Sequence, residues 1–126
     1  MRDHKSLIAW QRARDFVLTV YRVTATCWRP QHAAVIDQVR RSALSLQLNI
    51  AEGYALQSEG LFRKHLTIAY GSGVEAVDAL EVLIALIPTR NLDLELLPAV
   101  GGRCCALVLA LKHSIDRKKH NQAGGA

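Results

Sequence analysis

The feature that most constrains this fold is a spacing of three and four residues between apolar side chains, which recurs in four separate stretches. That spacing places the side chains on one side of an α-helix, which completes a turn about every 3.6 residues. It predicts helices over residues 8–28, 33–55, 59–87 and 94–118. Proline is unfavourable in the interior of a helix, so Pro30 and Pro88 are expected just beyond the ends of the first and third helices.

Four helices of similar length with short connections favour an all-α, antiparallel up-down-up-down four-helix bundle. The chain has 126 residues, of which 50% are apolar and 6% aromatic, as expected for one helical core. We therefore expect a single domain over residues 1–120. Residues 121–126 show no apolar periodicity, and they are predicted to be a disordered tail.

A second set of apolar residues lies outside the core stripes. On the third helix these residues recur every seven positions, with Glu75 among them, and on the second helix they lie almost opposite the stripe. A helix in a bundle contacts two neighbours, so a wide apolar arc is one explanation. The other, which we favour, is burial against further copies of the chain. The predicted interface residues are Leu44, Leu48, Leu61, Ile68 and Val82.

The basic residues are distributed unevenly. Sixteen Lys and Arg against eleven Asp and Glu give a net charge of +5, and residues 66–97 are acidic whereas both flanking segments are basic. Basic faces attract polyanions, so we predict weak, sequence-independent binding of RNA or DNA. The alternative is an oligomeric scaffold or protein-docking module without a nucleic-acid role, favoured if acids separate the cations in the fold. The candidate binding residues are Arg12, Arg22, Arg117, Lys118 and Lys119.

Motifs of catalysis are missing from the sequence. It has no P-loop, Gly-x-Ser-x-Gly or His-Glu-x-x-His motif, and no two histidines lie three or four residues apart. We therefore expect no enzymatic activity, no metal site and no cofactor. Three cysteines form no disulfide framework, the first residues lack a signal-peptide core, and no uncharged stretch exceeds ten residues. A cytoplasmic protein without a membrane span is the expectation.

One polar cluster remains, on the second and third helices. A carboxylate among apolar residues is costly unless it meets a cation, and arginine satisfies both carboxylate oxygens. Arg41 and Glu52 are eleven residues apart and share a helix face. We expect a structural role, with ion pairs that set helix or subunit register, rather than a ligand-binding one. The cluster comprises Arg40, Arg41, Asn49, Glu52 and Glu75.

These residues carry a resemblance to a known family. The segments Leu7-Ile8-Ala9-Trp10-Gln11-Arg12-Ala13, Gln38-Val39-Arg40-Arg41-Ser42-Ala43 and Asn49-Ile50-Ala51-Glu52-Gly53 resemble the four-helix bundle proteins encoded in intervening sequences of large-subunit ribosomal RNA genes. That family is also similar to accessory proteins of diversity-generating retroelements.

The resemblance implies a four-helix protomer, a homopentameric ring and no enzymatic activity. The retroelement relatives imply nucleic acid and a reverse transcriptase, or another protein, as further partners. The chain departs from the family pattern at Ala55-Leu56, Gly60-Leu61 and His65. These departures remove an arginine and a lysine from the turn between the second and third helices.

Overall fold

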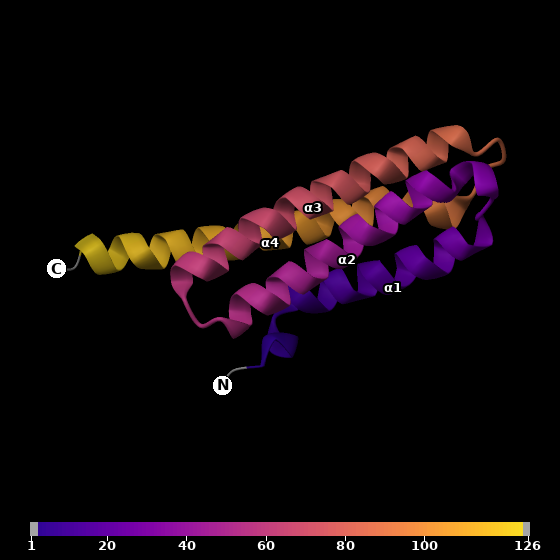
Figure 1. The fold of residues 1–126 in the computed structure, drawn as a ribbon. Helices are drawn as coiled ribbons and strands as arrows, with labels where there is room; N and C mark the ends of the chain where they lie inside the picture. The colour runs from indigo at the N-terminus through magenta and orange to yellow at the C-terminus, as the bar shows by residue number, and fades with distance from the viewer. Residues whose placement is uncertain (1–2, 125–126) are drawn as a thin grey trace.

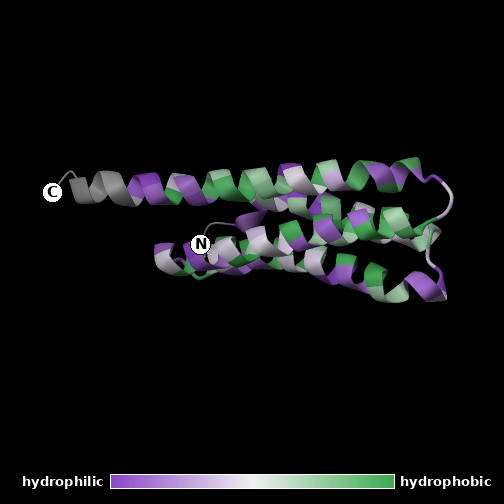
Figure 2. Cartoon of the chain, turned by 90° about the horizontal axis from the view of Figure 1, so that it is seen from above, coloured by the Kyte–Doolittle hydropathy of each residue, from purple (hydrophilic) through white to green (hydrophobic). Residues whose placement is uncertain are grey.

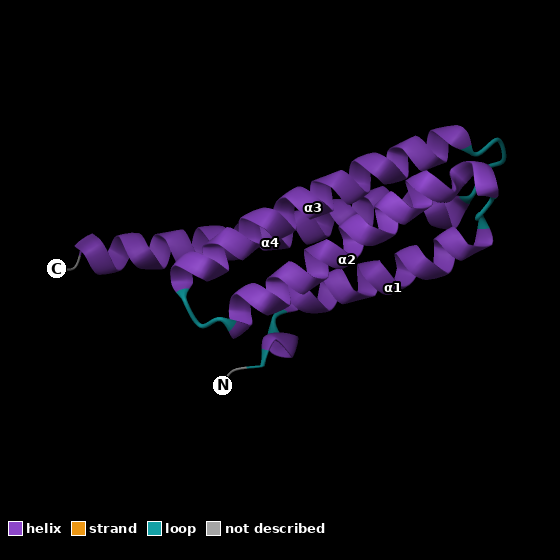
Figure 3. Cartoon of the chain, in the orientation of Figure 1, coloured by secondary structure: helices purple, strands orange, loops and turns teal. Residues whose placement is uncertain are grey.

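The structure is a computed structural model that describes the backbone of residues 3–124 and the side chains of residues 3–118. Four long helices, α1 to α4, form an up-down bundle (Figure 1). Within the described chain there are only helices and short loops (Figure 3), so the all-α bundle is confirmed. In chain order the elements are η1 (His4–Ser6), α1 (Ile8–Thr26), η2 (Pro30–His32), α2 (Ala33–Ala55), α3 (Glu59–Leu86) and α4 (Leu92–Gly124).

Each helix packs against the next in sequence, and α1 also packs against α4, which closes a square of four helices. The contact between α2 and α3 is the most extensive of the four, and that between α1 and α4 is the least extensive. In such a square, the outer surface of α2 and α3 lies on the opposite side of the bundle from that of α1 and α4. These two surfaces carry most of the candidate functional residues.

The core confirms the predicted apolar stripes. Val20, Ile36, Leu46 and Leu80 are fully buried. Phe16, which lies beside the predicted stripe of α1, is fully buried as well. Its ring explains Gly101: a Cβ atom there would lie 2.9 Å from Phe16 Cζ and 2.7 Å from Val77 Cγ2. Glycine at this position lets α4 approach both α1 and α3.

The ends of α4 differ from the prediction. The helix begins at Leu92 rather than at residue 94, because the Asn91 side chain accepts a hydrogen bond from the Leu94 N–H at 3.0 Å. Acidic residues Asp93 and Glu95 in the first turn also favour a helix N-terminus. At its other end α4 continues to Gly124 instead of residue 118, so the backbone of 121–124 is helical where a disordered tail was predicted. Residues 125–126 lie outside the described part.

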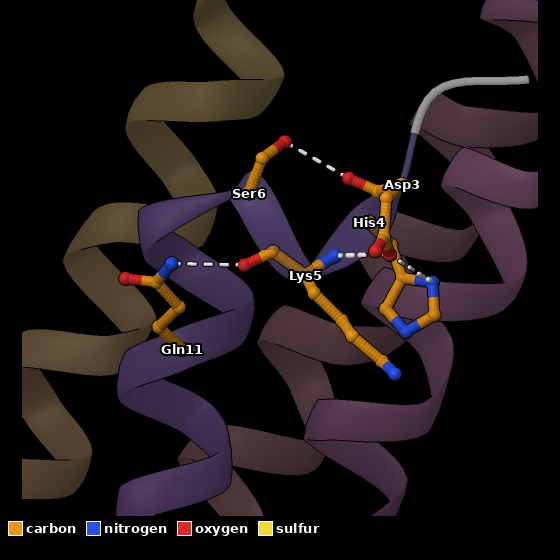
Figure 4. A network of polar contacts seen from close by, with 5 residues as sticks. All are labelled: Asp3, His4, Lys5, Ser6 and Gln11. Atoms are coloured by element: carbon orange, nitrogen blue, oxygen red, sulfur yellow. Dashed lines mark hydrogen bonds and ion pairs between the residues drawn. The ribbon is translucent and has the colours of Figure 1, made fainter.

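The N-terminal residues are tied to the bundle by short polar contacts (Figure 4). The Asp3 carboxylate accepts a hydrogen bond from the Lys5 N–H at 3.0 Å, and the Ser6 hydroxyl donates to the Asp3 carbonyl at 2.9 Å. Gln11 Nε2 on α1 donates to the Lys5 carbonyl at 2.8 Å. These contacts hold η1 beside the beginning of α1.

One described helix, α4, is long and apolar enough over Leu92–Lys118 to cross a membrane, judged by length and composition alone. Apolar residues predominate along much of it (Figure 2). A core helix of a bundle meets the same criteria, and Leu94, Leu97 and Val108 of α4 are buried in the hydrophobic core.

Candidate functional site

The contact between α2 and α3 contains a row of hydrogen-bonded polar side chains. Ser45 Oγ on α2 lies 2.8 Å from Ser72 Oγ on α3. Asn49 Nδ2 donates to the Ser45 carbonyl at 2.9 Å, and Asn49 Oδ1 lies 2.9 Å from His65 Nδ1. Because the amide oxygen can only accept, His65 carries its proton on Nδ1 in this contact. Asn49 therefore links α2 to α3, with a histidine as its partner.

Glu75 has a different partner from the one expected. Its carboxylate Oε1 accepts a hydrogen bond from Gln38 Nε2 at 2.9 Å, and the same amide donates to Ser42 Oγ at 3.0 Å. No arginine reaches Glu75 among the interactions of the described side chains. Because Glu75 is exposed at the edge of the α2–α3 contact, a neutral amide is sufficient to hold it.

Arg40 fastens α2 to α1. Its Nε donates to Thr24 Oγ1 at 2.9 Å, and its guanidinium carbon lies 4.9 Å from the centre of the Tyr21 ring. A guanidinium over an aromatic face is attracted by the ring quadrupole. Arg40 thus contacts a hydroxyl and an aromatic ring of α1 rather than a carboxylate.

Arg41 and Glu52 lie on the exposed side of α2, and neither forms an ion pair within the described part of the protomer. The predicted intramolecular ion pairs at these two residues are therefore not present. Gly53, the next residue, is buried. A Cβ atom at this position would lie 2.7 Å from His65 Cβ, so the close approach of α2 and α3 requires glycine here. In the segment 49–53, Asn49 and Gly53 serve the α2–α3 contact, whereas Glu52 faces outward.

Four of the five predicted interface residues are exposed on α2 and α3, whereas Leu44 lies one turn from Arg40 on the side of α2 that faces α1. Leu48, Ile68 and Val82 are 51%, 42% and 47% exposed, and Leu61 is also exposed, whereas Leu44 is half-buried against the core. The Asn49–His65 hydrogen bond places Leu48 and Ile68 within about one turn of each other along the bundle. Leu86, also exposed, continues the α3 stripe. We name the exposed residues Leu48, Leu61, Ile68, Val82 and Leu86 the apolar face.

A groove lies on the opposite side, between α1 and α4, with a volume of about 630 Å³. Two exposed arginines, Arg12 and Arg103, lie in this groove, and the chain as a whole carries a net charge of +5. Asp15, which has the opposite charge, also lines the groove. The remaining lining residues are apolar or cysteine. We name this feature the arginine groove; it is lined by Arg12, Asp15, Val100, Arg103, Cys104, Ala106 and Leu107.

The other predicted nucleic-acid residues are scattered. Arg22 is exposed on α1, seven residues beyond Asp15, and Arg117 is exposed near the far end of α4. Lys118 Nζ lies 3.8 Å from Glu59 Oε1, which offsets its charge. The Lys119 side chain lies outside the described residues. The structure thus brings Arg12 beside Asp15 and Arg103, but it does not gather the predicted cations into one patch.

The cysteines show no sign of activation. Burial, with a smaller contribution from neighbouring Cys105, raises the pKa of Cys104 from 9.0 to about 11. Burial also raises the pKa of Cys27 and of Cys105. A raised pKa keeps a thiol protonated and weakly nucleophilic. Within the described residues no three His, Cys, Asp or Glu side chains form a cluster that could hold a metal ion.

Some functional candidates were missed by the sequence analysis. Gln38 and His65 complete the polar row between α2 and α3, and Arg103 with Asp15 completes the groove. Arg103 follows two glycines and precedes two cysteines, so no charge run or motif marked it. Only the packing of α4 on α1 brings it near Arg12.

Comparison with known proteins bears on this arrangement. No curated protein matches the chain. A family model described as 23S rRNA-intervening sequence protein matches residues 5–93, which include α1, α2, α3 and the first two residues of α4. The match contains the polar row between α2 and α3, the segment Asn49–Gly53 and the whole apolar face. Because the matched part exceeds half of the chain, the protein belongs to the 23S rRNA-intervening sequence protein family.

Proposed function

We propose that the protein is a non-catalytic, cytoplasmic structural protein that assembles with copies of itself through the apolar face. The observation that carries this proposal is the number of large apolar side chains exposed on α2 and α3: Leu48, Leu61, Ile68, Val82 and Leu86. Monomeric proteins rarely expose extended apolar patches, and those that exist often mark contacts with other proteins. Such an assembly would act as a scaffold or docking platform.

The neighbouring polar groups support the same proposal. The amide and hydroxyl groups between α2 and α3 bond to one another, so they do not compete for a partner outside the protomer. Arg41 and Glu52 remain exposed beside the leucines. An apolar centre with a charged rim is the usual composition of a subunit interface.

The first experiment is to measure the mass of the assembly by light scattering. Five chains of 13.9 kDa, the number that the family resemblance implies, would give 69.5 kDa. Replacing Ile68 by Glu places a charge in the apolar face and is expected to reduce the mass without unfolding the protomer, because Ile68 is 42% exposed.

The matched control is Leu18→Glu, which introduces the same charge at a leucine on α1 that is 49% exposed and lies outside the apolar face. This variant is expected to keep the wild-type mass. A wild-type mass of 13.9 kDa at micromolar concentration would reject self-assembly. Equal loss of mass in both variants would reject the apolar face as the contact.

A second candidate function is weak binding of nucleic-acid phosphates. It is favoured by the exposed arginines Arg14 and Arg22 on α1 and Arg117 on α4, none of which forms an ion pair with a described carboxylate. Five copies would carry a formal charge of +25, which raises the field at the surface of an assembly. We rank this function second because Asp15, Glu59 and Asp116 are interspersed among the other cations.

Titration of labelled single- and double-stranded RNA and DNA at increasing salt tests this candidate. If phosphates carry the binding, the logarithm of the association constant should fall linearly with log salt, with a slope of about −0.7 to −0.9 per phosphate. Arg22→Gln and Arg117→Gln are expected to weaken binding. Arg90→Gln is the control, since Arg90 is exposed but paired with Glu95 at 3.1 Å. No binding at about 50 mM salt would reject the candidate.

A further inference from the structure

We propose that the outer surface of α1 and the α1–α2 turn binds single-stranded nucleic acid by stacking its bases on Tyr21 and Trp28. This inference rests on the second candidate function, the binding of nucleic-acid phosphates, and adds where the strand lies and which form of nucleic acid is preferred. We name this surface, which is separate from the apolar face, the aromatic surface; it comprises Tyr21, Trp28, Arg14, Arg22, Arg29 and Arg40.

The two aromatic side chains lie along one side of α1. This side is exposed at residues that are spaced by four, three and four positions, namely Arg14, Leu18, Tyr21 and Ala25. Trp28 continues the spacing just beyond the last turn of α1. Tyr21 is 41% exposed and Trp28 is 44% exposed. Aromatic rings that remain in contact with water are available to stack on another ring.

Arg40 holds the Tyr21 ring in a fixed orientation. It reaches from α2 to α1, which lie side by side (Figure 1), and its guanidinium carbon lies 4.9 Å from the centre of the ring. Its Nε donates to Thr24 Oγ1 at 2.9 Å and its Nη2 donates to the Tyr21 carbonyl at 3.4 Å, so the guanidinium itself is anchored. A ring that is already oriented loses little conformational entropy when a base stacks on its exposed part.

Unpaired arginines lie next to both rings. Arg22 follows Tyr21 in the chain, Arg29 follows Trp28, and Arg14 lies two turns before Tyr21. All three arginines are exposed, and none forms an ion pair with a described carboxylate. Arg29 Nη1 donates to the Trp28 carbonyl at 2.8 Å, which orients the side chain without neutralising its charge. These cations can contact the phosphates of a strand whose bases lie on the rings.

The residue types favour nucleic acid over an acidic protein segment. The acidic residues Asp15 and Asp37 are exposed on α1 and α2, but the four arginines of the aromatic surface outnumber them. The ligand is therefore an anion, and exposed rings among the cations favour an anion that also carries aromatic groups. Each nucleotide supplies a phosphate and a base, whereas an acidic peptide supplies the charge alone.

The separation of the two rings favours a single strand. The seven residues from Tyr21 to Trp28 rise about 10 Å along the helix axis. Successive nucleotides in one strand of a duplex rise only about 3.4 Å, and their bases are paired and stacked on one another. An extended single strand can place separate, unstacked bases on both rings.

The test titrates the full-length protein with three probes that have the same number of phosphates. They are a labelled oligothymidylate of about 16 nucleotides, a strand of equal length without bases, and a duplex. We expect the oligothymidylate to bind most tightly. Tyr21→Ala and Trp28→Ala should each weaken this binding about 5- to 150-fold, the loss expected for one stacked base, and Trp28→Phe should retain most of it. Tyr70→Ala is the matched control, since it removes a 37% exposed ring on α3 and should leave binding unchanged.

Tryptophan fluorescence reports the stacking itself. The chain has two tryptophans, and Trp10 is half-buried with its ring centroid 5.0 Å from that of His4. In the Trp10→Phe variant the emission therefore comes from Trp28 alone. We expect the oligothymidylate to quench this emission and the strand without bases to leave it unchanged.

The possible failures separate this inference from the candidate function on which it rests. If no probe binds at about 50 mM salt, both are rejected. If the strand without bases or the duplex binds as tightly as the oligothymidylate and Trp28→Ala binds like the wild type, phosphate binding stands and base stacking is rejected. Displacement of the oligothymidylate by polyglutamate, without quenching of Trp28 by either, would assign the aromatic surface to an acidic protein segment instead.

Discussion

The α2–α3 side of the bundle and the α1–α4 side are packed differently. Between α2 and α3 the contact is extensive and contains hydrogen bonds that involve Asn49, His65 and Gln38, while the outer surface is apolar. Between α1 and α4 the contact is the least extensive, and within residues 3–118 no side-chain hydrogen bond or ion pair joins these helices. Their outer surface holds a groove with two arginines.

The comparison shows where each side can gain free energy. Polar groups between α2 and α3 are satisfied by one another, and the exposed apolar side chains of the outer surface, which lie among Arg41, Glu52 and Glu75, would gain free energy by leaving water. Thin packing between α1 and α4 leaves a recess that a projecting side chain can fill.

The largest expected effect on stability comes from weakening the packing of α1 against α4. Phe16→Ala removes a fully buried ring that fills the space beside Gly101, and it should lower the free energy of unfolding by about 3–5 kcal/mol. Denaturant unfolding followed by circular dichroism measures this loss. Leu18→Ala, at an exposed neighbour, should change it by no more than about 0.5 kcal/mol. Equal losses would mean that α1 is not held through Phe16.

The reactivity of Cys104 sharpens the description of the groove. With its pKa raised from 9.0 to about 11 by burial, the thiolate at pH 8 should be about a hundredfold scarcer than in a free cysteine. Alkylation by iodoacetamide, located by mass spectrometry, should be slower by at least this factor in the folded protein.

The same pKa shift predicts a pH dependence of stability. Between pH 9 and about 11 the unfolded thiol loses its proton while the folded one retains it, so the free energy of unfolding should fall as the pH rises. The Cys104→Ser variant should lack this contribution. Alkylation at pH 8 that is as fast as in denaturant would contradict a buried Cys104.

On the α2–α3 side, two residues of one segment should behave differently. Asn49→Ala leaves His65 Nδ1 and Ser45 without their partner and should lower the free energy of unfolding by about 1–3 kcal/mol. Glu52→Ala removes an exposed carboxylate and should change it by no more than about 0.5 kcal/mol, while weakening self-assembly. Thermal unfolding and light scattering separate the two effects. Loss of stability in Glu52→Ala without a change in mass would reverse this assignment.

The smallest effect is expected outside both surfaces. Arg63 Nε lies 2.9 Å from Asp116 Oδ1 between α3 and α4, and the two side chains are 32% and 44% exposed. Asp116→Asn should lower the free energy of unfolding by only about 0.2–1 kcal/mol, less at high salt, because water screens such a pair. The assembly mass should not change. A change in mass would extend the subunit contact to the α3–α4 side.

Much of the fold could be read from the sequence because helical periodicity is a local property. The apolar spacing located four helices and most of the buried residues. The beginning of α4 was misplaced because Asn91, a cap, lies before a segment with Pro98 and two glycines that obscures the pattern. Phe16 was missed because it lies at the edge of the α1 stripe, where only a neighbouring helix decides burial.

The candidate site was predicted less completely, since its contacts join residues far apart in the chain. The sequence by itself determined that α2 and α3 carry apolar side chains outside their core stripes and that polar residues lie between them. Only the tertiary structure decided that Glu75 meets Gln38, that Arg41 and Glu52 remain unpaired in the protomer, and that Arg12 and Arg103 border one groove. The physical reason is that periodicity assigns each residue to a side of its own helix, whereas the rotation and register of packed helices assign its neighbours.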